Sequence, residues 1–234
     1  LDTLLKERLT GKPLAYVLGY WDFFGSRYFL APGVLVPRPE TELVVERALA
    51  LLERLTRKYK QSDITVLELG VGTGIVSVEI AKRYPECTFH GWDISDTAIN
   101  LSKRNASHFS CNQIMFHHGD FFADDVIYND FLMFETPTLF LSNPPYIPTH
   151  DIATLDSVVK DFEPLEALDG GADGLDIYRQ CLDLISKGHN MSFVFEIGIN
   201  QRLALSNECD LRNIKNYTFL KDLQGIDRVF STAL

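Results

Sequence analysis

The amino-acid sequence predicts a doubly wound α/β fold, with a mostly parallel sheet and helices on both of its sides. From residue 66 onward, short apolar runs typical of strands alternate with longer runs typical of helices. A glycine-rich loop at 70–74 joins the first of these strands to a helix. Gly70, Asp93, Asp120 and Asn143 all fall at or shortly after the ends of predicted strands. Ligands bind at this edge of such sheets.

The elements before the glycine-rich loop follow in order. Leucines at positions 1, 4, 5 and 9 predict a leading helix with one apolar face, which Gly11-Lys12-Pro13 ends. Residues 20–24 and 28–30 predict a β-hairpin around Gly25-Ser26. A helix is expected over 40–58.

The alternating region continues to the end of the chain. Its expected strands are 66–69, 88–92, 114–117, 139–142, 193–196, 217–220 and 228–231. Its expected helices are 75–83, 99–107, 174–186 and 201–209.

The loop Gly70-Val71-Gly72-Thr73-Gly74 indicates a nucleoside-binding site. Glycines at alternate positions let a ligand lie against the backbone, where a Cβ would collide with it. A dinucleotide-binding loop needs its third glycine one residue later, and position 75 is Ile. The spacing therefore favours a nucleoside with a small zwitterionic tail over a pyrophosphate.

Four side chains near strand ends are candidate contacts for such a nucleoside. Glu68, just before the loop, can accept from the ammonium of an amino-acid moiety. Asp93 stands roughly 20 residues beyond the loop, where a carboxylate can accept from both ribose hydroxyls. Asp120 can accept from an adenine amine while Phe121 packs on the ring.

The tetrapeptide Asn143-Pro144-Pro145-Tyr146 indicates chemistry on a planar NH₂ group. Proline has no N–H, so the Asn143 carboxamide oxygen and the Pro144 carbonyl are acceptors without competing donors from the prolines. Two acceptors that hold both amine hydrogens would orient the nitrogen lone pair and favour its pyramidalisation as a bond forms. An adenine amine, a cytosine amine and a glutamine amide all fit this description. A strand-ending turn without chemistry is the alternative.

Together these motifs resemble class I S-adenosylmethionine-dependent methyltransferases that act on a planar nitrogen. Further segments are similar to the HemK/PrmC family, which methylates the glutamine of the Gly-Gly-Gln motif in peptide-chain release factors. These segments are Val34 to Glu42, Phe162-Glu163-Pro164 with Ala167-Leu168, Gly171 to Leu175, Glu196-Ile197-Gly198, Lys221 to Leu223 and Asp227-Arg228. The resemblance covers nearly the whole chain, and its most specific segment is Pro37-Arg38-Pro39-Glu40-Thr41-Glu42.

The resemblance implies S-adenosylmethionine as cofactor and a release factor as partner. It places cofactor contacts on the 70–74 loop, Asp93, Phe121 and Asn143, and the substrate glutamine on Asn143, Pro144, Pro145 and Tyr146. Asn143, Pro144 and Tyr146 are the expected catalytic residues. Arg38, Glu40 and Glu163 are expected near the substrate loop on the family likeness alone.

Two departures from the family pattern are visible. Many bacterial members have Trp where this chain has Phe121, which keeps the ring packing and loses an indole N–H. Family members usually carry a small helical domain first, and residues 1–19 resemble its last part and a linker, with the catalytic domain at 20–234. Because the first residue is Leu, we expect a fragment or a processed product.

Two alternative functions are considered. An adenine or cytosine methyltransferase acting on DNA or RNA shares the tetrapeptide but must also grip phosphates. The 22 basic and 32 acidic residues give a net charge of −10, which does not supply an extended nucleic-acid face. The other alternative is a catalytically silent binding subunit, and the intact glycine loop, Asp93 and Asn143 argue against it.

The remaining composition predicts a cytoplasmic protein, which we expect to be a monomer. The four cysteines, Cys87, Cys111, Cys181 and Cys209, are widely spaced and form no C-x-x-C pair, which suits packing thiols in a reducing compartment. No apolar run approaches the length of a membrane span, and no metal site is expected.

Overall fold

The computed structural model describes residues 2–123, 136–188 and 190–233. Its largest feature is a seven-stranded sheet in the order β5-β4-β3-β6-β7-β9-β8. The neighbours from β5 to β7 pair in parallel, whereas β9 is antiparallel to both β7 and β8. This arrangement confirms the predicted doubly wound, mostly parallel sheet with an antiparallel C-terminal strand.

The strands have these bounds: β1 Tyr20–Phe23, β2 Ser26–Phe29, β3 Thr65–Leu69, β4 Thr88–Asp93, β5 Ile114–His118, β6 Thr138–Ser142, β7 Met191–Glu196, β8 Tyr217–Lys221 and β9 Asp227–Thr232. The α-helices are α1 Asp2–Leu9, α2 Leu14–Leu18, α3 Thr41–Thr56, α4 Ile75–Ala81, α5 Asp96–His108, α7 Ser157–Lys160, α8 Asp176–Lys187 and α9 Arg202–Leu211. Short 3-10 helices are η1 Gln61–Asp63, η2 Thr149–Thr154 and η3 Leu165–Ala167. Each element predicted from residue 40 onward is present, with bounds that differ by at most three residues.

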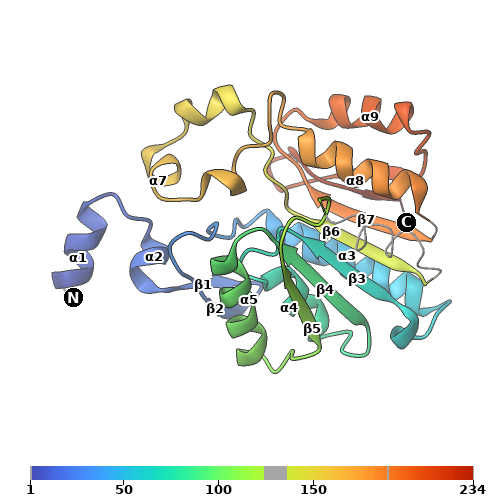
Figure 1. Cartoon of the computed structure of the whole chain (residues 1–234), viewed down its shortest axis with the longest axis horizontal. Coiled ribbons are helices and arrows are strands. Elements are labelled where there is room, and N and C mark those ends of the chain that lie inside the picture. Colours follow the sequence, from blue (N-terminus) through green and yellow to red (C-terminus); the bar gives the residue numbers. More distant parts are fainter. Residues whose placement is uncertain (1, 124–135, 189, 234) are drawn as a thin grey trace.

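Helices cover both faces of the sheet (Figure 1). One hydrophobic core lies between the sheet and helices α3 and α4, and contains Val45 and Val78. A second core lies against α8 and α9 and contains Tyr178 and Leu205. Every residue of β3 and of β6 is buried, because these central strands are covered on both faces.

The strand order reverses between β3 and β6. The chain builds β3, β4 and β5 outward in one direction and then places β6 on the other side of β3. The loops that follow β3 and β6 therefore leave the sheet side by side, and a Cβ built on Gly70 would lie 3.9 Å from the Asn143 carbonyl oxygen. Ligands bind at such a switch point in open α/β sheets.

The hairpin β1–β2 packs beside the catalytic sheet. Its turn is Phe24-Gly25 and not the predicted Gly25-Ser26, since both Phe24 and Gly25 have positive φ, as a type I′ hairpin turn requires. The Phe24 N–H donates to the Glu42 carboxylate at 2.7 Å. The Tyr28 hydroxyl donates to the buried Glu79 on α4 at 2.5 Å, which fixes the hairpin to the core.

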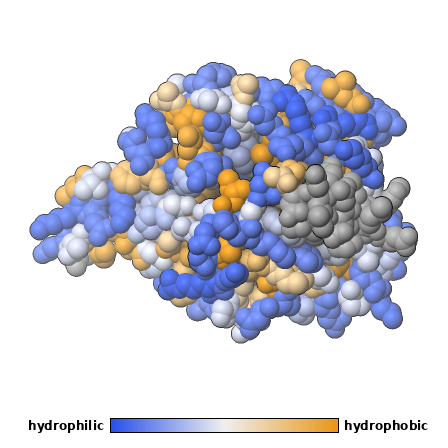
Figure 2. All heavy atoms as spheres, in the orientation of Figure 1, coloured by the Kyte–Doolittle hydropathy of each residue, from blue (hydrophilic) through white to orange (hydrophobic). Residues whose placement is uncertain are grey.

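Helices α1 and α2 project from one side of the molecule (Figure 1). Leu4, Leu5 and Leu9 of the predicted apolar face are exposed, and no residue of α1 is buried. Hydrophobic atoms are visible on this projection in Figure 2. Helix α2 ends at Gly19, whose φ of 74° is the left-handed conformation of a helix C-cap.

All four cysteines are buried free thiols, as their predicted packing role requires. Cys87 and Cys111 belong to the core against α3 and α4, and Cys181 and Cys209 to the core against α8 and α9. Within the described ranges, no helix is long and apolar enough to span a membrane. No three potential metal ligands cluster among those same residues.

Candidate active site

A cavity opens at the switch point, beyond the carboxyl ends of β3, β4 and β6. Its wall includes every predicted cofactor-binding residue except Gly74. Pro144 and Pro145 line it as well, and Pro164 and Glu166 close it from the segment that follows α7.

The glycine loop shapes the floor of this cavity. Gly70, Gly72 and Gly74 have φ values of 68°, 52° and 75°, which favour glycine. A Cβ on Gly74 would lie 2.8 Å from the Cβ of Ser102, so this glycine lets α4 pack closely on α5. Gly70 and Gly72 face the cavity, and Gly74 serves the packing behind it.

Asp93 is held in place by the backbone. Its Oδ2 accepts from the Gly72 N–H and its Oδ1 from the Ser95 N–H, each at 2.9 Å. Burial raises the pKa of the carboxyl, and these two N–H donors oppose that rise. Each oxygen keeps a free lone pair, so the carboxylate is oriented and can still accept from ribose hydroxyls.

Glu68 lies deeper, at the end of β3, and is 3% exposed. Its Oε2 accepts from the Ser77 N–H at 3.0 Å and from the Ser77 hydroxyl in the first helical turns of α4. Burial raises the pKa of Glu68 to about 7. The side chain thus joins the end of β3 to the start of α4, and its predicted contact with an ammonium group stays a prediction.

Phe121 and Asp120 occupy the far wall. The Phe121 ring is 3% exposed and stands edge-on to Trp92, with centroids 5.3 Å apart. The Asp120 Oδ1 accepts from the Phe122 N–H at 2.9 Å, which orders the turn after β5. Both residues line the cavity, as an adenine pocket requires.

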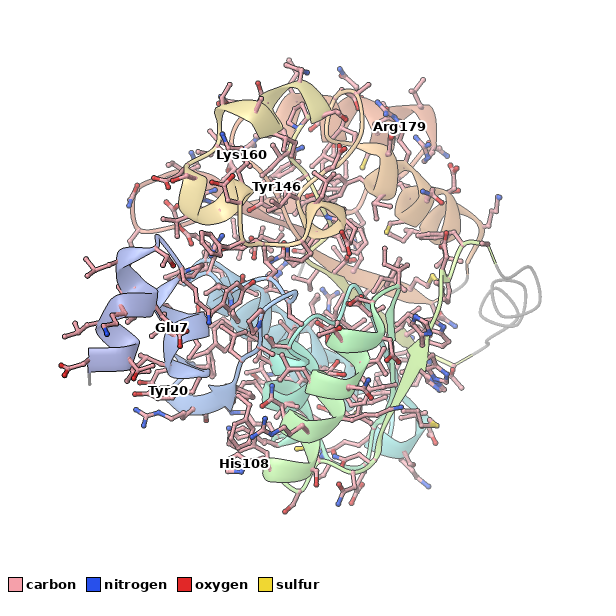
Figure 3. All side chains as sticks on the ribbon, turned by 60° about the vertical axis from the view of Figure 1, so that its left-hand side comes forward. Glu7, Tyr20, His108, Tyr146, Lys160 and Arg179 are labelled. Atoms are coloured by element: carbon pink, nitrogen blue, oxygen red, sulfur yellow. The ribbon has the colours of Figure 1, made fainter. Side chains whose placement is uncertain are left out.

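The backbone of the Asn143-Pro144-Pro145-Tyr146 segment is packed against glycines. A Cβ on Gly170 would meet the Pro145 carbonyl at 2.7 Å, and one on Gly174 would meet the Tyr146 carbonyl at 2.3 Å. The Gln201 side-chain amide donates to the Tyr146 carbonyl at 3.1 Å. The Tyr146 side chain (labelled in Figure 3) is half-buried and packs against the core that contains Tyr178. The tetrapeptide therefore has a fixed backbone.

The next residues close the segment 148–168 into a loop. The Ile147 N–H donates to the Leu168 carbonyl at 3.0 Å, and the Gly170 N–H donates to the Ile147 carbonyl at 2.9 Å. Thr149 donates its hydroxyl to Asp169 at 2.7 Å. We call these hydrogen bonds between the two ends of the loop the neck of the loop.

The three predicted substrate-loop residues form ion pairs. Arg38 donates from one Nη2 to both oxygens of Glu163, at 2.8 and 2.9 Å. Glu163 is only 6% exposed, and its carboxylate faces Arg38. Glu40 lies at the start of α3, 3.8 Å from Arg228. Their substrate-binding role stays a prediction.

Sequence reasoning gave no role at the site to two residues that the structure places behind the tetrapeptide. The Asn143 Nδ2 lies 3.4 Å from the Thr41 Oγ1, and Thr41 lies 2.6 Å from the Glu196 Oε2. The Tyr146 hydroxyl donates to the Glu196 Oε1 at 3.3 Å. Thr41 and Glu196 both lie in segments that carry the family resemblance, and this is the signal in the sequence that could have indicated a role at the site.

Comparison with known proteins agrees with this geometry. The family model of a methyltransferase domain matches residues 60–163. A release factor glutamine methyltransferase from Thermodesulfovibrio yellowstonii is 34% identical over 98% of this chain and 79% of its own. The enzymes of that name from Geobacter sulfurreducens and Neisseria gonorrhoeae are 34% and 33% identical, over 97% of this chain and 75% and 79% of theirs.

Solved structures share the fold at low sequence identity. The catalytic domain of human METTL16, in complex with an RNA hairpin, has a TM-score of 0.69 and 13% identity over 94% of this chain and 81% of that one. The METTL16 N-terminal domain in complex with SAH has a TM-score of 0.59 and 12% identity over 97% and 92%. A ribosomal protein L11 methylase from Lactobacillus delbrueckii has a TM-score of 0.54 and 15% identity over 92% and 91%.

The fold and the cavity at its switch point define a class I S-adenosylmethionine-dependent methyltransferase. Within that class, the identity to curated relatives over nearly the whole chain is decisive. The chain belongs to the family of release factor glutamine methyltransferases.

The Asp93→Ala variant tests the ribose contact. Loss of a charge-assisted contact to two hydroxyls is expected to cost about 1.5 to 3 kcal/mol, or roughly tenfold to more than a hundredfold in affinity for S-adenosylmethionine. Isothermal titration calorimetry measures the change. The control is Asp210→Ala, an exposed acid that does not line the cavity and whose loss should leave affinity unchanged. Unchanged affinity in Asp93→Ala would exclude this contact.

Proposed function

We propose that this protein transfers a methyl group from S-adenosylmethionine to the side-chain amide nitrogen of glutamine in the Gly-Gly-Gln motif of a peptide-chain release factor. The observation that carries the proposal is the position of Asn143 and Pro144, which line the same cavity as the glycine loop and Asp93. A planar amide held there lies next to a cofactor bound in that cavity.

The cavity suits the cofactor on several counts. Gly70 and Gly72 allow close approach of a ligand to the backbone, Asp93 is already oriented, and Phe121 offers a buried ring face. When bound there, S-adenosylmethionine supplies an electrophilic methyl group on a sulfonium. The protein residues then have to align the amide and exclude competing geometries.

Asn143 and Pro144 hold the amide during transfer. Their two carbonyl oxygens accept the two N–H hydrogens of the glutamine, which turns the nitrogen lone pair toward the methyl group. As the C–N bond forms and the C–S bond breaks, the nitrogen becomes pyramidal and its N–H groups more acidic, so both acceptors bind it more strongly. The surplus proton leaves after bond formation, and no strong base is required. Such alignment can supply several kcal/mol, since positioning effects reach roughly 7 to 11 kcal/mol in good cases.

The two alternative functions have less support. The net charge of −10 does not favour binding of a nucleic-acid backbone. A catalytically silent subunit would not require an oriented Asp93 or a tetrapeptide backbone packed closely against Gly170 and Gly174. The relatives that match nearly the whole chain are curated as enzymes.

Mass spectrometry of candidate substrates tests the proposal. The protein is incubated with a release factor, or with an oligonucleotide that carries an unpaired adenine, and with isotopically labelled S-adenosylmethionine. We expect one labelled methyl group on the glutamine of the Gly-Gly-Gln loop. Label on the oligonucleotide in preference to the release factor would reject the proposal in favour of a nucleic-acid methyltransferase.

A further inference from the structure

We infer that Glu196 and Thr41 are positioning residues that fix the orientation of the Asn143 carboxamide, with its oxygen toward the substrate amide. The inference rests on the proposed function, because it assigns Asn143 the role of acceptor. It adds a part of the site that lies behind the cavity, since Thr41 borders the cavity and Glu196 does not.

The three side chains form a chain of hydrogen bonds from β7 to the tetrapeptide. Glu196 is the last residue of β7 and is 2% exposed. Its Oε2 lies 2.6 Å from the Thr41 hydroxyl, a short distance typical of a bond to a charged acceptor. Thr41 is the first residue of α3 and is 4% exposed. Its oxygen lies 3.4 Å from the Asn143 Nδ2.

The direction of these bonds follows from the number of protons. A threonine hydroxyl has one proton to donate, and a carboxylate can only accept. When Glu196 is ionised, the Thr41 proton is committed to Glu196, so the Thr41 oxygen can only accept from Asn143. Asn143 must then present its NH₂ to Thr41. Its oxygen is left to face the cavity, which is the orientation that an acceptor for a substrate amide requires.

Protonation of Glu196 would reverse this direction. A neutral Glu196 can donate to Thr41, and Thr41 can then donate to the Asn143 oxygen. The carboxamide would turn its NH₂ toward the substrate NH₂, where two donors face each other. Such an arrangement removes the Asn143 acceptor and leaves only the Pro144 carbonyl for the reacting amide.

The surroundings of Glu196 place this change near neutral pH. The pKa of Glu196 is raised to about 7, mainly by burial and also by the nearby Glu40 carboxylate, while the hydrogen bonds from Thr41 and Tyr146 and the charge of Arg228 oppose the rise. Tyr178, from α8, donates to the Glu196 backbone carbonyl at 2.6 Å and not to its carboxyl. Because the ionised form is the productive one, kcat should rise as pH increases through about 7.

Two substitutions at Thr41 provide a matched pair. Thr41→Val keeps the shape and removes the hydroxyl, whereas Thr41→Ser keeps the hydroxyl. We expect Thr41→Val to lower kcat by about tenfold to a hundredfold, since loss of alignment at the reacting atoms has effects of this size. Thr41→Ser should restore kcat to within about threefold of the wild type, because it restores the bond that sets the Asn143 orientation. Thermal unfolding shows whether each variant is folded.

Glu196→Gln tests the charge. A glutamine amide can donate to Thr41, so this variant should hold Asn143 in the unproductive orientation, with a lower kcat and no rise through about pH 7. The profile is measured at saturating S-adenosylmethionine, because Glu68 also has a pKa near 7 and lies in the cofactor cavity. If Glu196→Gln does not fold, the difference in kcat between Thr41→Val and Thr41→Ser tests the inference.

A measurement without substrate separates this inference from the proposed function. The side-chain ¹⁵N–¹H resonances of Asn143, assigned by comparison with Asn143→Asp, should titrate with an apparent pKa near 7 in the wild type and not in Glu196→Gln. Failure of the wild type to methylate Gly-Gly-Gln would reject the function and leave this measurement valid. Equal kcat in folded Thr41→Val and Thr41→Ser, or Asn143 resonances that do not depend on Glu196, would overturn the inference.

Discussion

Replacing Asn143 by alanine is expected to lower kcat by about a hundredfold or more, as loss of one polar group that stabilises a transition state does in other enzymes. The substitution removes one of the two acceptors for the reacting amide and leaves the Pro144 carbonyl in place. It also removes the donor that faces Thr41 at 3.4 Å. Single-turnover methyl transfer to a Gly-Gly-Gln peptide measures the effect on the chemical step.

Cofactor binding must be measured separately for this variant, because Asn143 also lines the cofactor cavity. Asn100→Ala is the matched control, since Asn100 is an exposed asparagine on α5 whose side chain donates to Asp96. Its kcat should equal that of the wild type. A change of less than about threefold in Asn143→Ala would show that this carboxamide does not stabilise the transition state.

A Gly-Gly-Asn peptide is expected to react at least about a hundredfold more slowly than Gly-Gly-Gln. Asparagine is one methylene shorter than glutamine, so its amide falls short of the Asn143 and Pro144 acceptors. A displacement of about 1 Å from the position of attack can cost on the order of a hundredfold in rate. The backbone of the tetrapeptide cannot follow the shorter side chain, because Gly170 and Gly174 pack directly against it.

Competition between the two peptides shows whether the difference lies in binding or in chemistry. Gly-Gly-Asn should inhibit methylation of Gly-Gly-Gln at a concentration similar to the KM of the glutamine peptide, since the glycine-flanked loop is the same. Equal rates for the two peptides would mean that the acceptors are not matched to the length of glutamine, and would contradict the assigned substrate.

The parts of the structure that depend on local sequence were predictable. Strand and helix alternation follows from the spacing of apolar residues, and the positions of Gly70, Asp93 and Asn143 at strand ends bring them together once the sheet is parallel. The hairpin turn was placed one residue late, because Ser26 was read as a turn residue and Phe24 is an unusual residue at positive φ.

The parts that depend on pairing over long distances were not predictable. Arg38 and Glu163 are 125 positions apart, and Thr41 and Glu196 are 155 apart. No local pattern links such residues, and each alone is typical of a helix entry, a loop acid or a strand end. Only the fold shows that Glu163 is turned inward to Arg38 and that Glu196 lies behind Asn143.

The neck between Ile147 and Gly170 separates the length of the 148–168 loop from the geometry of the tetrapeptide. Because its two ends are hydrogen-bonded to each other, residues can be added or removed at the exposed tip without moving Asn143. The entropic cost of a longer loop grows only slowly, by about 0.6 kcal/mol for each doubling of its length. The exposed tip of this loop is therefore exchangeable: grafting a different tip onto the same neck, with Glu163, Pro164 and Glu166 kept in place, offers a route to enzymes that accept other glutamine-bearing proteins.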